Sequence, residues 1–341
     1  MVRLTDQQAY MLTFIDQRPR AAIQGVAGSG KTMLAQAQAQ RFADRGLSVL
    51  FTCFNKGLAH WLQDTLPADY SEQITVRHFH GLCDEWCQEA GIPFDPDNHD
   101  PATFWREIAP NRLMDALDII QRRFDAIVVD EGQDFHPDWW VPLEALNTKA
   151  QAGPLYVFFD PAQNLFVDRE WNLPDIDGEP YVLERNCRNT RRIAQTCGEI
   201  IEKLIETHEL APEGTETIFR TAQTNREQIQ VCGEILKEWV GQGQLQYQQI
   251  AILSPLTKPK SSLDGVDNIA KFPIINDVGA WQKNKGILFS TIRSFKGLEA
   301  DAVILIDAAE PDTKPYFKRP DYYVACSRAK HRLAVIRKAA D

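Results

Sequence analysis

Residues 25–32 read Gly25-Val26-Ala27-Gly28-Ser29-Gly30-Lys31-Thr32, and this stretch decides the fold of the first half of the chain. It fits the pattern G-x-x-x-x-G-K-[ST], whose glycines let backbone N–H groups curl around phosphate oxygens. The apolar residues 21–23 before it predict a buried strand, and residues 33–40 after it predict a helix. A strand, a glycine-rich turn and a helix N-terminus in this order predict a site for a nucleoside triphosphate.

The same pattern assigns roles to single residues. We expect the Lys31 ammonium to reach the β- and γ-phosphates and the Thr32 hydroxyl to ligate Mg²⁺. The predicted cofactors are therefore ATP and Mg²⁺. The other loop residues predicted to bind the nucleotide are Gly25, Ala27, Gly28, Ser29 and Gly30.

A length of 341 residues favours two domains over a single core. Strand-like apolar runs alternate with helical stretches, which predicts an α/β class with parallel sheets. The runs form two series, at residues 21–24, 49–54, 74–76, 126–130 and 155–160, and then at 181–183, 250–254, 287–290, 302–306 and 333–336. We predict a first domain over residues 1–178 and a second over residues 179–341.

The formal net charge of −10 disfavours a chain that binds nucleic acid over its whole surface. Residues 1–180 hold 14 Lys and Arg against 27 Asp and Glu, whereas residues 181–341 hold 23 against 20. A groove for a polyanion would therefore be local, with much of its charge from the second half. No apolar run approaches the roughly 18 residues of a membrane span. Seven cysteines without a regular framework favour the reducing cytoplasm.

The fourth predicted strand, at residues 126–130, ends in Asp130, and a second acid, Glu131, follows it. In a P-loop ATPase, Asp130 at this place would hold Mg²⁺, and Glu131 would orient and deprotonate the attacking water. Taken alone, the two acids also suit a strand end that caps a helix. The loop about 100 residues upstream favours the catalytic interpretation.

The stretch Asp130-Glu131-Gly132-Gln133-Asp134 resembles motif II of superfamily 1 helicases, D-E-x-Q-D. Further motifs follow in the order of that family across nearly the whole chain. Leu4-Thr5-Asp6-Gln7-Gln8 resembles the Q motif of UvrD/Rep-type helicases, in which Gln8 would read the adenine edge. The resemblance implies two tandem RecA-like domains with ATP in the cleft between them.

Three motifs of the first half carry further predicted contacts. Phe54-Asn55-Lys56 resembles motif Ia, and residues 78–82 resemble motif Ib, with Phe79 and His80 at its centre. Both motifs face single-stranded nucleic acid in the family. Residues 160–166 resemble motif III, in which Gln163 would couple the γ-phosphate to the strand-binding surface.

The second half carries the remaining motifs. Residues 183–190 resemble motif IV, in which Arg188 would contact the γ-phosphate. Residues 291–299 resemble motif V, which implies nucleic-acid contacts at Thr291 and Ser294 and a nucleotide contact at Glu299. Residues 323–329 resemble motif VI, with Arg328 as the arginine finger.

Two departures from the family affect the prediction. Cys187 stands where the family has a tyrosine that stacks on the adenine, so nucleotide selectivity is expected to be relaxed. The gaps at 82–126 and 190–291 leave little room for the long insertions of UvrD/Rep proteins. The chain therefore resembles a two-domain motor without those insertions, in which translocation is better supported than unwinding.

The predicted function is an ATP- and Mg²⁺-dependent translocase or helicase on single-stranded DNA, with the 3′-to-5′ polarity that the resemblance implies. One alternative is a nucleotide-gated module that acts on a partner protein, such as a nuclease or a repair or defence factor. Another is the same motor on RNA, because stacking and backbone contacts suit either strand.

Two other features have structural interpretations that we prefer. His78, His80, Cys83 and Cys87 are ligand types for zinc, but their spacing is not that of a zinc ribbon or finger. Trp139 and Trp140 suit packing against the sheet better than stacking on bases.

Overall fold

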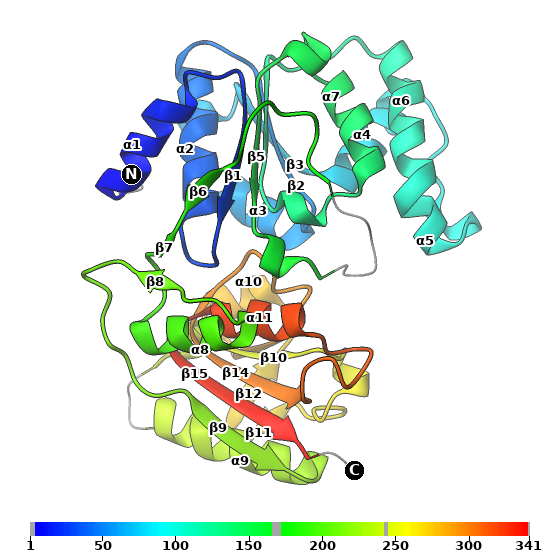
Figure 1. The fold of residues 1–341 in the computed structure, drawn as a ribbon. Coiled ribbons are helices and arrows are strands. Elements are labelled where there is room, and N and C mark those ends of the chain that lie inside the picture. The colour runs from blue at the N-terminus through cyan, green and yellow to red at the C-terminus, as the bar shows by residue number, and fades with distance from the viewer. Residues whose placement is uncertain (1–3, 166–171, 242–244, 340–341) are drawn as a thin grey trace. The chain divides into compact units, whose positions relative to one another are not determined.

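A six-stranded parallel sheet organises the first part of the chain, in the order β3-β2-β4-β5-β1-β6 (Figure 1). The computed structural model describes residues 4–165, 172–241 and 245–339. Phe166, at the end of the predicted motif III, lies outside them. The strands are β1 (Arg20–Gly25), β2 (Val49–Cys53), β3 (Ile74–His78), β4 (Ala126–Val129), β5 (Leu155–Phe159) and β6 (Tyr181–Leu183). The helices are α1 (Asp6–Ile15), α2 (Lys31–Asp44), α3 (Lys56–Thr65), α4 (Phe79–Ala90), α5 (Pro101–Thr103), α6 (Ala109–Ile119) and α7 (Trp140–Ala145).

Both faces of this sheet are covered, which is why its strands are almost continuously apolar. Alternate side chains of β4 show the division. Ala126 and Val128 belong to a core that includes residues of α1, α2 and α3. Ile127 and Val129 belong to a second core that includes residues of α4, α6 and α7. A strand buried on both faces has no polar side, so length and flanking turns identify it better than alternation.

A second sheet of seven strands organises the later part of the chain, in the order β11-β12-β13-β10-β14-β15-β9. Every neighbouring pair is parallel except β11 and β12. The strands are β9 (Ile218–Ala222), β10 (Ile250–Ser254), β11 (Asn268–Ile269), β12 (Phe272–Ile275), β13 (Ile287–Thr291), β14 (Ala300–Ala308) and β15 (Ala329–Lys338). The helices are α8 (Arg191–Ile201), α9 (Asn225–Trp239), α10 (Val278–Gln282) and α11 (Arg319–Ser327), and a separate pair of strands joins β7 (Arg185–Asn186) to β8 (Glu206–Thr207).

The chain divides into a first unit, Met1–Gly25 with Gly30–Leu183, and a second unit, Val26–Ser29 with Glu184–Asp341. Each unit holds one of the two mainly parallel sheets. The predicted fold class, tandem α/β domains of the RecA-like kind, is confirmed.

One predicted strand belongs to a different sheet from the one expected. The run at residues 181–183 is expected in the second series, but it forms β6, which pairs with β1, with Tyr181 opposite Ile23. The run is apolar enough to predict a strand, and nothing local in it specifies the partner. Within the described residues, no helix has both the length and the apolar character needed to cross a membrane.

Candidate nucleotide and nucleic-acid sites

The predicted phosphate loop connects the end of β1 to the start of α2. Gly28 and Gly30 have φ values of +76° and +87°, in the left-handed region that L side chains rarely adopt. Gly30 is the N-cap of α2, a helix of 14 residues, and makes no side-chain cap. The backbone N–H groups and the positive end of the helix dipole at this point suit an anion.

Lys31 and Thr32 occupy the first turn of α2. The Lys31 ammonium bends back over the loop and donates to the Gly25 carbonyl at 2.8 Å. It also lies 3.8 Å from the Asp160 carboxylate. The Thr32 hydroxyl donates to Asp130 Oδ2 at 2.6 Å. The structure therefore brings together the residues predicted to hold the phosphates and the metal.

Asp130 follows β4 and is fully buried. Its second oxygen, Oδ1, accepts a hydrogen bond from the Glu131 backbone N–H at 3.0 Å. Burial, and next the Glu131 charge, raise the pKa of Asp130 to about 7. A hydroxyl and a carboxylate side by side are oxygen donors of the kind that Mg²⁺ prefers. Thr32 and Asp130 therefore fit this ion.

Glu131 has φ +56° and ψ +41°, a left-handed conformation that costs a non-glycine residue about 1–3 kcal/mol. Its side chain is buried and accepts a short hydrogen bond from Gln133 Nε2. The Oε1 atom of the same Gln133 accepts from the Asp160 backbone N–H at 2.9 Å. Gln133 therefore connects the predicted catalytic base to the end of β5.

Asp160 joins the motifs of the first unit. Its Oδ2 accepts from Gln163 Nε2 at 2.7 Å and lies near the Lys31 ammonium. Gln133 binds its backbone, as described above. Gln163 is predicted from the sequence, whereas the connecting roles of Asp160 and Gln133 are visible only in these contacts. The signals present were the acid that starts the 160–166 motif and the glutamine of D-E-x-Q-D.

Gln8 lies at the start of α1 and contacts the phosphate loop. Its Oε1 accepts from the Thr5 backbone N–H at 2.9 Å and completes a capping box. A Cβ atom added to Gly30 would lie 2.2 Å from Gln8 Nε2. The side chain predicted to read the adenine therefore packs on the N-cap of α2.

The predicted strand-binding residues of the first unit differ in exposure. Phe79 is fully buried and stacks on Trp139 with ring centroids 5.0 Å apart. We therefore withdraw Phe79 as a nucleic-acid contact, because its ring belongs to the core beneath the site. Phe54 is half-buried against Trp139, and His80 contacts the Trp105 carbonyl at 2.8 Å.

Asn55 and Lys56 begin α3. Asn55 Oδ1 accepts from the Leu58 N–H at 3.1 Å and caps the helix, whereas the Lys56 side chain is exposed. Among the predicted strand contacts of this unit, Lys56 is therefore the cation best placed for a phosphate. His78 caps α4, and burial, with Lys56 next, lowers its pKa.

The other side chains considered for zinc or bases are used in packing. Cys83 and Cys87 are buried on α4, and burial raises the pKa of both thiols. Trp139 and Trp140 are also buried, and their Nε1 atoms donate to backbone carbonyls at 2.9 Å. The structural interpretation of the two tryptophans is confirmed.

In the second unit, Arg188 is held by two acceptors. Its Nη1 donates to Glu299 Oε2 at 3.1 Å, and its Nη2 donates to the Ser327 carbonyl at 2.7 Å. Among the residues that the structure describes, the buried Nε atom has no hydrogen-bond partner. The other Glu299 oxygen lies 2.5 Å from Lys330 Nζ. Burial alone would raise the pKa of Glu299, but Arg188 and Lys330 outweigh it and lower the pKa, so this carboxylate is ionised.

Arg328 ends α11 and is 3% exposed. Its Nε donates to the Val324 carbonyl at 3.2 Å, and its Nη2 donates to the Ser327 hydroxyl at 3.1 Å. It also contributes to the low pKa of Glu299. Glu299 thus pairs directly with Arg188 and with Lys330, a residue that the sequence did not single out.

Thr291 is the last residue of β13, and Ser294 lies in the turn that follows. The Thr291 hydroxyl donates to Ser294 Oγ at 2.8 Å and accepts from the Ser294 N–H at 3.1 Å. The fully buried Phe295 anchors this turn and meets the Trp281 ring edge to face. The buried ring therefore fixes the turn that presents the hydroxyls of Thr291 and Ser294 at the surface.

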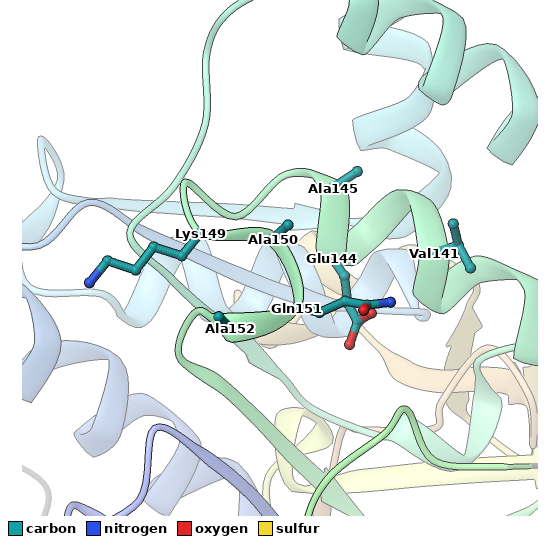
Figure 2. A pocket seen from close by; sticks show the side chains of 7 residues that line it. All are labelled: Val141, Glu144, Ala145, Lys149, Ala150, Gln151 and Ala152. Carbon is teal, nitrogen blue, oxygen red and sulfur yellow. The ribbon is translucent and has the colours of Figure 1, made fainter.

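A surface hollow of about 420 Å³ lies elsewhere in the first unit (Figure 2). Glu144, on its wall, forms an ion pair with Arg20 at the start of β1. The phosphate loop follows the opposite end of β1, so this hollow is separate from the nucleotide site. It is lined by Val141, Glu144, Ala145, Lys149, Ala150, Gln151 and Ala152.

With this geometry established, known proteins provide a comparison. The family model described as "UvrD-like helicase C-terminal domain" matches residues 286–336. Over these residues the chain is similar to the C-terminal domain of UvrD-like helicases. The match contains both the 291–299 and the 323–329 motifs, so the predicted resemblance is confirmed where these motifs lie, and a helicase-type NTPase is supported in general.

Among solved structures, this chain is similar to the one titled "The structure of PRRSV helicase". The identity is 15%, the TM-score is 0.46, and the alignment covers 96% of this chain and 54% of the other. The chain therefore spans about half the length of that helicase. No curated protein matches it.

Proposed function

We propose that this protein hydrolyses ATP with Mg²⁺ and uses the energy to move along single-stranded DNA, in the 3′-to-5′ direction that its superfamily resemblance implies. The observation that carries the proposal is the continuous set of contacts from Lys31 through Asp160 to Gln163, and from Asp160 through Gln133 to Glu131. It connects the predicted phosphate ligand, catalytic base and coupling residue within one unit.

The residues divide the chemistry among them. Thr32 and Asp130 would hold Mg²⁺, which supplies charge neutralisation at the phosphates. Glu131, fixed by Gln133, would orient the attacking water and accept its proton. Lys31, Arg188 and Arg328 would stabilise negative charge that develops on the γ-phosphate.

For movement, ATP hydrolysis then has to change how tightly each unit binds the strand. The exposed Lys56 and the hydroxyls of Thr291 and Ser294 are our proposed strand contacts, one set in each unit. ATP and its products would favour different positions of the units, which alternates the grip. These side chains would contact the sugar–phosphate backbone of the strand, so they do not by themselves distinguish DNA from RNA.

The proposal is tested by ATP turnover with and without a single strand of oligo(dT), with oligo(U) of equal length alongside. We expect strong stimulation that weakens steeply with salt. Glu131→Gln provides the background rate. ATP turnover that neither strand changes would refute the proposal of a motor. Stimulation by oligo(U) alone would show that the motor moves on RNA and not on DNA.

A second candidate is a nucleotide-gated module acting on a partner protein. The compact first unit favours it, because only short helices lie between α4 and β4, where superfamily relatives carry an insertion. Displacement of a protein block from a tethered strand distinguishes this module from a motor, since only a motor displaces the block.

The seven cysteines are free thiols, which agrees with our proposal of a cytoplasmic protein.

A further inference from the structure

Three aromatic rings and a guanidinium form a row on the outside of α1 and β6, here called the aromatic ladder: Tyr10, Phe14, Tyr181 and Arg18. The Tyr10 and Phe14 rings are stacked with centroids 6.4 Å apart, and Phe14 meets Tyr181 edge to face at 5.6 Å. The Arg18 guanidinium carbon lies 5.6 Å from the centre of the Tyr181 ring. The row is therefore continuous from one turn of α1 to the edge strand of the sheet.

The ladder is exposed to an unusual degree. Tyr10 is 72% exposed and Phe14 is 46% exposed, and the adjacent Val182 is 46% exposed. Leu12 and Ile15 of the same helix are buried in the core. The helix α1 thus has an apolar face toward the core and a second one toward solvent, and exposed apolar patches of this kind mark interaction sites.

The ladder faces away from the nucleotide residues. Gln8 points to Gly30, whereas Tyr10 follows Gln8 by two residues, or about 200° around the helix. The ladder therefore does not extend the adenine site, and its function is separate from the one proposed above.

Carboxylates border the ladder at both ends. Asp6 lies one helical turn before Tyr10 and is exposed. At the other end, Arg18 Nη1 donates to the Asp177 carbonyl at 3.4 Å, which holds an acidic turn against the ladder. The exposed acids of that turn and the residues after it are Asp175, Asp177 and Glu179.

This charge selects the occupant. A nucleic acid would meet the acidic rim with its phosphates. Arg18, the one cation of the ladder, would not compensate, and the nearby Arg41 and Arg45 are already paired with Asp16. An apolar segment that ends in lysines or arginines would bury the rings and pair with the rim. Tyrosine and arginine are also the residues that most often carry binding energy at protein interfaces.

We propose that the aromatic ladder is the docking surface for a basic amphipathic helix of a partner protein. The stripe from Tyr10 to Phe14 follows the axis of α1, so a second helix can lie along it by ordinary side-chain packing. The helix would place its apolar side chains on the rings and its basic ends near Asp6 and Asp177.

The test uses a fluorescent 18-residue helical peptide of leucine and lysine, with a leucine–glutamate peptide as its charge-reversed control. Anisotropy is measured against the full chain and against Tyr10→Ala/Phe14→Ala. We expect the double variant to bind at least tenfold more weakly and the glutamate peptide not to bind. The matched control is Leu204→Ala/Leu210→Ala. It removes two leucines outside the ladder that are 84% and 86% exposed, and it should bind the lysine peptide like the wild type.

Unchanged basal ATP turnover and melting temperature would show that the double variant is folded. Equal peptide affinity of wild type and double variant overturns the proposal, as does equal binding of the glutamate peptide. Two further measurements also decide against it. One is loss of labelled oligo(dT) binding in the double variant, which would make the ladder a strand surface. The other is self-association of the wild type that the double variant abolishes.

Discussion

Replacing Asp130 by asparagine should stabilise the metal-free protein above neutral pH. Burial and the neighbouring Glu131 raise the pKa of Asp130 from an ordinary value of 3.8 to about 7. The folded state therefore binds the proton more tightly than the unfolded state. The resulting stability is fully present below about pH 4, falls as the pH rises, and is lost above about pH 7.

The magnitude follows from the two pKa values. The gap between 3.8 and about 7 corresponds to about 4 kcal/mol in the free energy of unfolding. Asparagine is neutral and can keep both contacts, accepting from the Glu131 N–H through Oδ1 and donating to the Thr32 hydroxyl through Nδ2. We expect Asp130→Asn to exceed the wild type by about 2–4 kcal/mol at pH 8 and to match it near pH 4.

The assay is urea unfolding in EDTA across this pH range, followed by tryptophan fluorescence. Asp138→Asn is the matched control, because that carboxylate is 72% exposed and its removal takes no charge out of the core. Adding Mg²⁺ should narrow the difference, since the cation compensates the charge of the wild type alone. An asparagine variant that is less stable at pH 8, or a difference that is equal at pH 5 and pH 8, would refute the reasoning.

Three further predictions concern activity. Glu131→Gln should keep ATP binding while lowering kcat about 10²–10⁴-fold, measured by equilibrium binding and single-turnover hydrolysis, and turnover near wild type would exclude Glu131 as the base. Cys187→Tyr should increase the preference for ATP over GTP by adding a ring where the family stacks one, and an unchanged ratio of dissociation constants would contradict this. Trp281→Ala should weaken the stimulation of ATP turnover by a strand more than it weakens basal turnover, because Trp281 supports Phe295. Trp281→Phe should retain part of the stimulation. Equal loss of basal and stimulated turnover would indicate general unfolding and contradict the prediction.

The sequence predicts most of the first sheet because its strands are buried on both faces and stand out as apolar runs. The edge strands were harder. β9 (Ile218–Ala222) has three exposed residues in its middle, so it lacks both the continuous apolar run and strict alternation. β6 was recognised as a strand but assigned to the wrong sheet, because its pairing with β1 joins residues about 158 positions apart.

The predicted nucleotide residues could be named from the sequence because their spacing is local. Lys31 and Thr32 follow the glycine turn directly, and Asp130 ends an apolar strand. The connecting role of Asp160 was not predictable in this way, since it depends on β4 and β5 being neighbours in the sheet. Phe79 was predicted to contact nucleic acid because residues 78–82 resemble motif Ib, and the sequence does not show that this ring faces the core.

The arrangement around Asp160 implies that the motifs of the first unit do not act independently. The Asp160 carboxylate lies near the Lys31 ammonium and accepts a hydrogen bond from Gln163. The Asp160 backbone N–H donates to Gln133, whose side chain in turn donates to Glu131. A phosphate that attracts Lys31 competes with Asp160 for the same charge. Removing Gln163 or Gln133 therefore changes the surroundings of the other through Asp160. In a double-mutant cycle their effects on turnover should depart from additivity, as expected for residues within one hydrogen-bond network.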